Sequence, residues 1–282
     1  MADFTAPAST DGVSLLPSLT GKGKQRSSSV YVEYFEGGIT PNYKEFEPSH
    51  RSRRRNQMQL IRFDNIVGVR YDVKSADDNF EIYDVVADPK EAKNLGKDPN
   101  FSALQQQMKD KVLQVRRPDA EAPRTYDDAL VPALINNKVV NGITWKAFKG
   151  NFLWLPEVKS LNPVAVGVTD LPVVGKTNQG KGDVYSFEGY IKVPADGTYT
   201  FYLTADTKAF LRIHDAAVID EDFGYIAGTE KEGKIKLKAG LHPFRIYCST
   251  PAELKTALLK LQWEGLSIVK TTIPANIFYR NK

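Results

Sequence analysis

The chain has 282 residues, of which 41% are hydrophobic and 26% charged, the composition of a soluble globular protein with room for two domains. No stretch approaches the apolar length of a membrane-spanning helix, so no membrane span is expected. The net charge of +4 is too small to indicate a nucleic-acid partner, and a single cysteine, Cys248, excludes an intrachain disulfide.

The N-terminal region is predicted to contain a loop and a short helix. Residues 1–5 carry neither the basic segment nor the apolar core of a signal peptide. We therefore expect either a cytoplasmic protein or a chain that begins inside a longer natural product. Residues 11–21 hold a leucine-rich segment that is interrupted by Pro17 and closed by Gly21, which favours a loop and a short helix.

A small antiparallel sheet is predicted next, because apolar and polar residues alternate in several short runs. Residues 41–56 have no period of two or 3.6 and carry four arginines, so they are predicted to form a long loop. The turn between the second and third strands is expected at Phe63 and Asp64. The strands are expected at residues 30–35, 57–62, 65–71 and 80–84.

The longest helical pattern follows this sheet. Asp98 is the expected N-cap, and Pro118 ends the helix. A helix with one apolar face is expected to pack across the sheet, so the predicted fold of residues 1–125 is α+β, a small antiparallel sheet with one packed helix. The apolar face comprises Phe101, Leu104, Met108, Val112 and Val115.

An all-β region begins after a change in composition. Residues 118–123 are rich in proline, alanine and acid, and residues 126–140 are predicted to be a linker. Residues 141–282 are predicted to form a β-sandwich. In its clearest part Phe201 and Leu203 alternate with polar residues, and they are expected to share a core face with Leu211 and Ile213.

The motifs of this second region resemble the PA-fourteen (protective-antigen-type) domain. Gly-Thr-Tyr-Thr-Phe-Tyr-Leu at 197–203 is followed by a short acidic turn and by Phe-Leu-Arg-Ile at 210–213. Leu-Leu-Lys-Leu-Gln-Trp-Glu-Gly at 258–265 and Ile-Pro-Ala at 273–275 follow in the family's order. The resemblance covers about half of the chain. It implies a β-sandwich that accompanies enzymes acting on glycans and in several members binds sugar.

The first region resembles the C-terminal subdomain of type I sulfatases. The most specific phrase lies at residues 81–95, and the leucine–proline phrase at 14–19 supports it independently. The resemblance covers roughly residues 1–125 and implies a four-stranded antiparallel sheet with one helix. The sequence departs from the family at Val67 and in the arginine-rich insertion.

The catalytic motif of that family is missing from the sequence. Sulfatases of this type use a formylglycine within Cys/Ser-x-Pro-x-Arg and a calcium ion, which in the family lie upstream of the stretch that matches here. The sequence contains no such motif, and Cys248 lacks an arginine at the required place. We therefore expect no sulfate release from this chain alone.

A group of polar residues would, by the same resemblance, face the active cleft of a complete sulfatase. Arginine guanidinium groups bind sulfate oxygens in bidentate fashion, so a glycan, including a sulfated one, is the expected partner. The alternative is a solvated basic loop, and a nucleic-acid role is disfavoured because no aromatic residues are interleaved. The group consists of Glu33, Tyr34, Glu36, His50, Arg51, Arg53, Arg54 and Arg55.

The sandwich region offers two further candidates. The family's calcium-dependent sugar binders use two adjacent aspartates in the turn at residues 204–208, where only Asp206 remains and Lys208 adds a positive charge. Calcium at Asp206 is therefore disfavoured. Trp154 is a candidate sugar platform with burial in the core as the alternative, whereas Trp263 is predicted to be in the core. The other carboxylates considered for an acidic pocket are Asp215, Asp220, Glu221 and Asp222.

The leading hypothesis is a non-catalytic C-terminal part of a sulfatase-like, glycan-active protein. Its PA-fourteen module would bind carbohydrate or direct the protein to its substrate, and an upstream sulfatase catalytic domain would be its partner. The family resemblance implies a periplasmic or extracellular location. The alternative is a self-standing adhesion or scaffold protein that uses both domains for protein contacts, and an enzyme complete in this chain is the third hypothesis.

Overall fold

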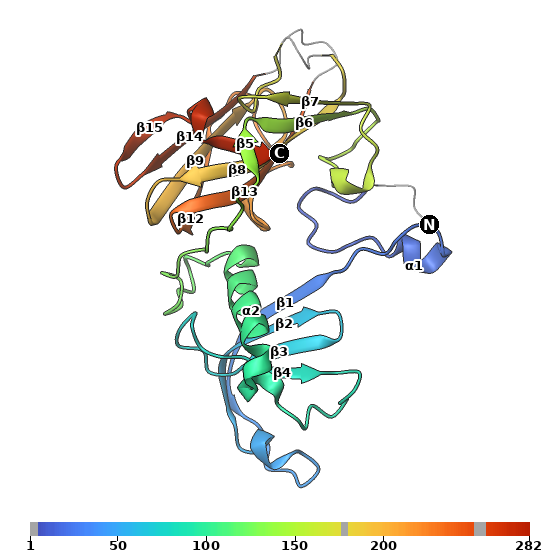
Figure 1. Cartoon of the computed structure of the whole chain (residues 1–282), viewed down its shortest axis with the longest axis vertical. Coiled ribbons are helices and arrows are strands. Elements are labelled where there is room, and N and C mark those ends of the chain that lie inside the picture. The colour runs from blue at the N-terminus through green and yellow to red at the C-terminus, as the bar shows by residue number, and fades with distance from the viewer. Residues whose placement is uncertain (1–4, 176–179, 251–257) are drawn as a thin grey trace. The chain divides into compact units, whose positions relative to one another are not determined.

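The computed structural model describes residues 5–175, 180–250 and 258–282, which form two compact units (Figure 1). Residues 11–129 form one unit, here called the helix–sheet unit, and residues 5–10 and 130–282 form the sandwich unit. No helix within the described ranges is long and apolar enough to cross a bilayer.

The helix–sheet unit contains a four-stranded antiparallel sheet in the order β1-β2-β3-β4, as the sequence predicts. A short helix, α1 (Leu16–Thr20), precedes it and ends at Gly21 in the left-handed conformation. The strands are β1 (Ser29–Ile39), β2 (Arg54–Phe63), β3 (Ile66–Arg70) and β4 (Glu81–Asp84).

The first hairpin is longer than predicted, and the prediction that residues 54–56 belong to a loop is wrong. Gly38 pairs with Arg55 and Ile39 with Arg54, so only residues 40–53 connect the two strands. A bulge between Phe35 and Gly38, with Gly37 at φ 72°, shifts the register within β1. Because a bulge interrupts the alternation of side chains, the sequence pattern stops before the strand does.

Helix α2 (Ser102–Val115) lies across the sheet, as predicted (Figure 1). Met108 and Val112 are fully buried in a cluster with Ile61 of β2 and Ile82 of β4. The predicted N-cap is displaced by one turn: Asp98 accepts a hydrogen bond from the Asn100 N–H and so caps a short 3₁₀ turn that leads into the helix. The 3₁₀ turns of this unit are Pro48–His50, Leu95–Lys97 and Pro99–Phe101.

The sandwich unit consists of two antiparallel sheets, which confirms the all-β prediction. The larger sheet runs β11-β10-β13-β8-β16-β5, with β6 paired to β8 and β7 to β6, and the smaller runs β12-β9-β14-β15. The larger sheet contains β5 (Val139–Asn141), β6 (Ile143–Phe148), β7 (Ala165–Thr169), β8 (Val184–Val193), β10 (Ala209–Ile213), β11 (Ala216–Glu221), β13 (Gly240–Ser249) and β16 (Phe278–Asn281). The smaller contains β9 (Gly197–Ala205), β12 (Lys231–Leu237), β14 (Leu259–Gly265) and β15 (Ile268–Thr272), and 3₁₀ turns lie at Val158–Ser160 and Ala275–Ile277.

The sandwich core is aromatic. Phe201 and Leu203 on β9 and Leu211 and Ile213 on β10 are all buried, but β9 and β10 belong to different sheets. The predicted shared core therefore lies between the sheets and not on one sheet face. Trp263 is buried as predicted and stacks on Tyr199, with 5.6 Å between the ring centroids.

The N-terminal segment packs on the sandwich unit, although the sequence analysis assigns it to the first domain. The Ala8 N–H donates to the Leu155 carbonyl at 2.7 Å, and Arg212 Nη2 donates to the Ala8 carbonyl at 2.9 Å. Ala8 is buried in an apolar cluster that includes Phe210 and Tyr247. The segment therefore helps to cover a cluster that includes side chains of β10 and β13.

The predicted linker is shared between the units. Tyr126 is buried in the helix–sheet unit, where its hydroxyl donates to Glu33. Val131 and Leu134 donate backbone hydrogen bonds of 2.9 and 2.8 Å to the carbonyls of Lys236 and Leu241 in the sandwich unit. Much of the predicted 126–140 linker is therefore tied to one unit or the other.

Candidate functional site

A cleft of about 510 Å³ lies beside the loop at residues 40–53, and we call it the arginine cleft. It brings together three of the predicted site residues, His50, Arg53 and Arg55. Its other lining residues are Thr40, Glu45, Phe46, Glu47, Met58, Tyr71 and Lys90.

Arg53 is held from three sides. Its Nη1 donates to Glu81 Oε2 at 2.8 Å, its Nη2 donates to the Ser49 carbonyl at 2.9 Å, and its guanidinium lies 4.4 Å from the centroid of the Tyr71 ring. Burial alone would lower the pKa of Arg53, but the Glu81 carboxylate outweighs burial and raises it. Arg53 therefore stays charged and fixed in orientation at the cleft wall.

His50 belongs to the same hydrogen-bonded chain. The Tyr83 hydroxyl donates to Glu81 Oε2 at 2.7 Å, so it accepts from His50 Nε2 at 3.2 Å. Burial and the neighbouring Glu81 carboxylate raise the pKa of Tyr83, which keeps the hydroxyl protonated. This series of hydrogen bonds fixes the side chains of His50 and Arg53 in the cleft through Tyr83 and Glu81 of β4.

Arg55 has one ion pair and one uncommitted donor. Its Nη2 lies 2.7 Å from Glu36 Oε1, which places the predicted residue Glu36 behind the cleft as a counter-ion. The buried Nε of Arg55 has no hydrogen-bond partner among the described residues. Lys90 adds a further exposed cation to the lining.

The other arginines do not enter the arginine cleft. Arg51 donates to the carbonyls of Phe46 and Lys44 at 2.7 and 2.6 Å, so it shapes the loop from within. Arg54 lines a second pocket of about 370 Å³ together with Arg70, and Arg53 lines both this pocket and the arginine cleft. Since neighbouring residues of a strand face opposite sides of a sheet, Arg54 and Arg55, the first two residues of β2, point to opposite faces.

Glu33 is part of an internal polar network. Its carboxylate accepts hydrogen bonds from Arg116 Nε and the Tyr31 hydroxyl, each at 2.7 Å, and from Tyr126 and Gln57. Burial by itself would raise the pKa of Glu33, but the donors outweigh it and hold the pKa below its usual value. All of these partners lie within the helix–sheet unit, so Glu33 ties the segment after α2 to the sheet. Tyr34, next to it, is exposed on β1.

The candidate residues of the sandwich unit also make structural contacts. Trp154 is half-buried, and its indole N–H donates to the Thr5 carbonyl at 2.7 Å. Asp206 exchanges hydrogen bonds with the backbone of Leu258, so its carboxylate joins the ends of β9 and β14. The Cys248 thiol is fully buried, which raises its pKa to about 12 and keeps it protonated at neutral pH.

The residues around Asp206 do not fit a calcium ion. In the described ranges no three carboxylate, histidine or cysteine side chains gather as a metal site would require. Other carboxylates of the sandwich unit have partners of their own: Asp215 pairs with Arg245, Glu221 pairs with Lys231, and Asp222 accepts from the Leu155 N–H and lies 3.6 Å from Lys208 Nζ.

The sequence analysis did not identify Tyr71, Glu81, Tyr83 and Lys90 as site residues. A signal for two of them was present, because Glu81 and Tyr83 lie two residues apart on a predicted strand and must share a face. The arrangement offers anchored guanidinium groups and aromatic rings, which can bind an anionic, partly apolar ligand.

Two family models match the chain. The PA14 domain matches residues 146–276, and the C-terminal domain of N-sulphoglucosamine sulphohydrolase matches residues 1–118. No curated protein matches the chain.

Several solved structures are similar to about half of the chain. One is an anti-sigma factor domain-containing protein from Clostridium clariflavum (22% identity, TM-score 0.41, 57% of this chain and 52% of that one). Another is a PA14 sugar-binding domain from an RTX adhesin, with 14% identity, a TM-score of 0.42 and coverage of 50% of this chain and 99% of that one. A third is the Epithelial Adhesin 9 A domain from Candida glabrata in complex with Galb1-3GlcNAc, with 12% identity, a TM-score of 0.38 and coverage of 53% of this chain and 94% of that one. The chain spans about half the length of the anti-sigma factor domain-containing proteins. The chain therefore contains a sulfatase-type C-terminal domain at residues 1–118, followed by a PA14 domain at residues 146–276.

Proposed function

We propose that this chain is the non-catalytic C-terminal part of a sulfatase-type, glycan-active protein. In this proposal the arginine cleft binds a sulfated sugar, and the PA14 domain binds carbohydrate or directs the protein to its substrate. The observation that carries the proposal is the cleft itself, where Arg53 and Arg55 stand beside Tyr71 and Phe46.

The cleft chemistry favours a sulfated sugar over a simple inorganic anion. Sulfate oxygens accept charge-assisted hydrogen bonds from guanidinium and ammonium groups, and Arg55 and Lys90 bring one of each to the cleft. The rings of Tyr71 and Phe46 offer apolar surface to the C–H groups of a sugar ring. Glu45 and Glu47 line the same cleft and disfavour a ligand that carries negative charge on all sides.

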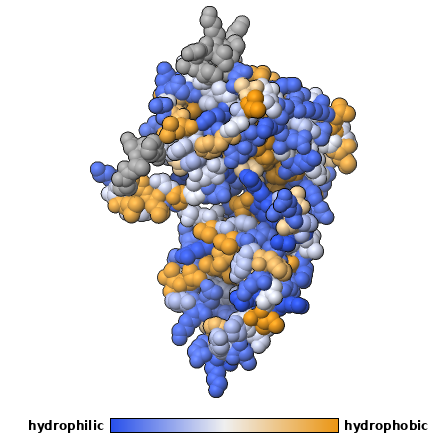
Figure 2. Space-filling model, turned by 180° about the vertical axis from the view of Figure 1, so that it is seen from behind, coloured by the Kyte–Doolittle hydropathy of each residue, from blue (hydrophilic) through white to orange (hydrophobic). Residues whose placement is uncertain are grey.

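A catalytic domain is the proposed partner of the helix–sheet unit. Strand β1 is an edge strand, and Val30, Val32 and Tyr34 lie two residues apart on one of its faces with 47%, 45% and 47% exposed. Figure 2 shows apolar patches between hydrophilic ones at the surface of this unit. A row of exposed apolar side chains of this kind is suited to cover by another domain. The proposal includes a periplasmic or extracellular location, for which the family resemblance is the support.

The test is calorimetric titration of the full chain with a heparin hexasaccharide. Arg55→Gln and Lys90→Gln should each weaken binding about tenfold, because each removes a charge-assisted hydrogen bond. Arg62→Gln is the matched control, since Arg62 is exposed in the same unit, outside the cleft, and bonds to the Asp64 carbonyl. Affinity should also fall with added salt.

Two results would count against the proposal. Equal weakening by Arg62→Gln would show that the hexasaccharide senses net charge and not the cleft. Binding too weak to measure at low salt would leave a solvated basic loop as the account of the arginines. In that case the exposed row on β1 would favour the adhesion or scaffold hypothesis.

A further inference from the structure

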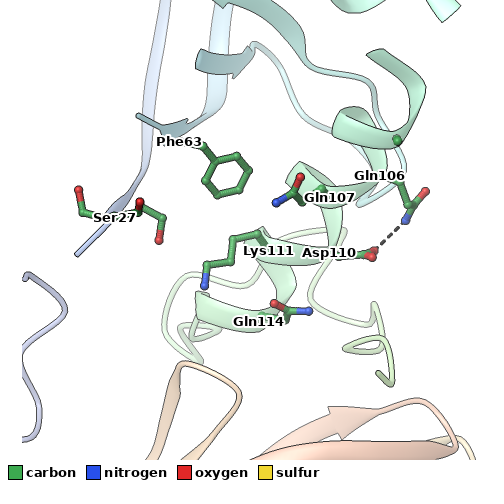
Figure 3. Close-up of a pocket in the computed structure, with 10 residues that line it drawn as sticks. Ser27, Phe63, Gln106, Gln107, Asp110, Lys111 and Gln114 are labelled. Carbon is green, nitrogen blue, oxygen red and sulfur yellow. Dashed lines mark hydrogen bonds between the residues drawn. The ribbon is translucent and has the colours of Figure 1, made fainter. Parts of the chain in front are cut away.

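A polar groove of about 760 Å³ runs along the exposed face of α2 in the helix–sheet unit (Figure 3). Ser27 and Ser28 from the segment before β1 form one side, Phe63 at the end of β2 forms its base, and Gln107 and Gln114 come from α2. We infer that this groove binds an uncharged stretch of a glycan.

The groove lining is polar but has no net charge. Most of its polar groups are glutamine carboxamides and serine hydroxyls, and its one aspartate and one lysine, Asp110 and Lys111, offset each other. Carboxamides and hydroxyls both donate and accept hydrogen bonds, as the hydroxyls of a sugar do. An anionic ligand finds no net positive charge in this groove, whereas an uncharged polyhydroxyl ligand finds matching hydrogen-bonding groups.

The glutamines are spaced along the groove. Gln107 and Gln114 are seven residues apart, so they lie on the same face of α2 about 10 Å from each other along the helix axis. Hydrogen-bonding groups at this separation reach more than one ring of an extended oligosaccharide. The site therefore fits a chain of sugars better than a single one.

Phe63 supplies the apolar surface. Its ring is half-buried and packs against the cluster that contains Ile61 and Met108, so its position is fixed before a ligand arrives. Figure 3 shows the ring pointing into the space between Ser27 and α2. A sugar ring presents C–H groups on one face and hydroxyls at its rim, which matches an aromatic base with polar walls. A fixed base also lowers the ordering cost of binding.

The groove shares no lining residue with the arginine cleft. The inference goes beyond the proposed function, because it adds a second subsite with the opposite charge preference. Each site has its own probe: the sulfated hexasaccharide tests the cleft, and uncharged tetrasaccharides test the groove. Either one can fail without the other.

The experiment is calorimetric titration of the full chain with chitotetraose and with cellotetraose, both uncharged. Gln107→Ala and Gln114→Ala should each weaken binding about fivefold, the effect of one neutral hydrogen bond. Phe63→Leu should weaken it further, and Phe63→Trp should retain it because the indole still offers an apolar face. Gln106 also lines the groove, but its side chain donates to Asp110 at 2.7 Å and points away from Phe63 (Figure 3). The control is therefore Asn100→Ala, which removes an exposed carboxamide of the same unit outside the groove.

The outcomes separate the groove from the PA14 domain. All three tryptophans, Trp145, Trp154 and Trp263, lie in the sandwich unit, so their fluorescence reports on that unit. Weakened binding in the groove variants, with an unchanged thermal midpoint and with Asn100→Ala unaffected, supports the inference. No measurable binding of either tetrasaccharide overturns it. Binding that survives the groove variants and changes tryptophan fluorescence belongs to the sandwich unit and also overturns it.

Discussion

Each unit contains a buried polar network that joins separated segments, and the two networks differ in charge. In the helix–sheet unit the Glu33 carboxylate accepts hydrogen bonds from four side chains, one of them the Arg116 guanidinium. In the sandwich unit His214 and His242 pair with each other at 2.9 Å, and both are buried. Separated segments are therefore joined by an ion pair in one unit and by two imidazoles in the other.

The largest expected effect comes from breaking the charged network. Glu33→Gln leaves the Arg116 guanidinium, whose side chain is 7% exposed, with Asp127 as its remaining ion-pair partner. Loss of one partner from a buried pair costs about 3–5 kcal/mol, so the helix–sheet unit should unfold at clearly lower urea concentration. The measurement is circular dichroism at 222 nm, which reports mainly on α2.

Glu36→Gln is the control for that variant. Glu36 pairs with Arg55 but is more exposed, and such pairs contribute about 1 kcal/mol or less. A Glu33→Gln midpoint no lower than that of Glu36→Gln would show that the network is not held together by its charge. A shift of the tryptophan transition in either variant would mean that the units do not unfold separately.

The contrast between the arginines shows how far the sequence could predict the site. The residue types could be proposed for sulfate from the sequence, because guanidinium chemistry does not depend on the fold. Their grouping could not be predicted, since Arg55 lines one pocket, Arg54 another and Arg53 both. The bulge at Gly37 hid the strand that contains Arg54 and Arg55, and with it the alternation that separates them.

The sheet order and α2 were predictable because they depend on local periodicity. The position of the N-terminal segment was not, because it depends on contacts between residues far apart in the chain. Arg212 bonds to Ala8 across 204 residues, and no local pattern marks residues 5–10 for such a contact. The same reason explains why Glu33 was predicted at a cleft, whereas its donors come from residues 31, 57, 116 and 126.

A second prediction concerns this N-terminal segment and has an intermediate expected effect. Ala8→Asp places a carboxylate in the apolar cluster with Phe210 and Tyr247, where Ala8 is 1% exposed. Burying an unpaired charge should cost the sandwich unit at least about 2 kcal/mol, limited by the freedom of the segment to detach. The measurement is the urea midpoint by tryptophan fluorescence.

Thr10→Asp is the matched control, since Thr10 is exposed in the same segment. The Ala8→Asp variant should leave the 222 nm transition of α2 unchanged. If Ala8→Asp instead shifts that transition and spares the fluorescence, the segment stabilises the helix–sheet unit, as the sequence analysis assumed.

The smallest expected effect, and the sharpest contrast between the two networks, is their response to acid. His242 Nε2 donates to the Lys238 carbonyl at 2.7 Å, so its Nδ1 must accept from His214 Nε2. Burial lowers the pKa of His242, and a proton added at Nδ1 would face the His214 N–H. Because the folded pKa lies below the unfolded value of about 6.5, the stability from this pair is complete above that pH and is lost as pH falls. The Glu33 pKa is also lowered, but from 4.5, so its contribution persists until the solution is more acidic.

Between pH 7.5 and 5.5 the free energy of unfolding from the fluorescence transition should therefore fall by about 1 kcal/mol, while the value from the 222 nm transition stays constant. His242→Gln should flatten the fluorescence profile against pH. A profile that keeps its slope in the His242→Gln variant would assign the acid response to other groups and remove the contrast between the networks.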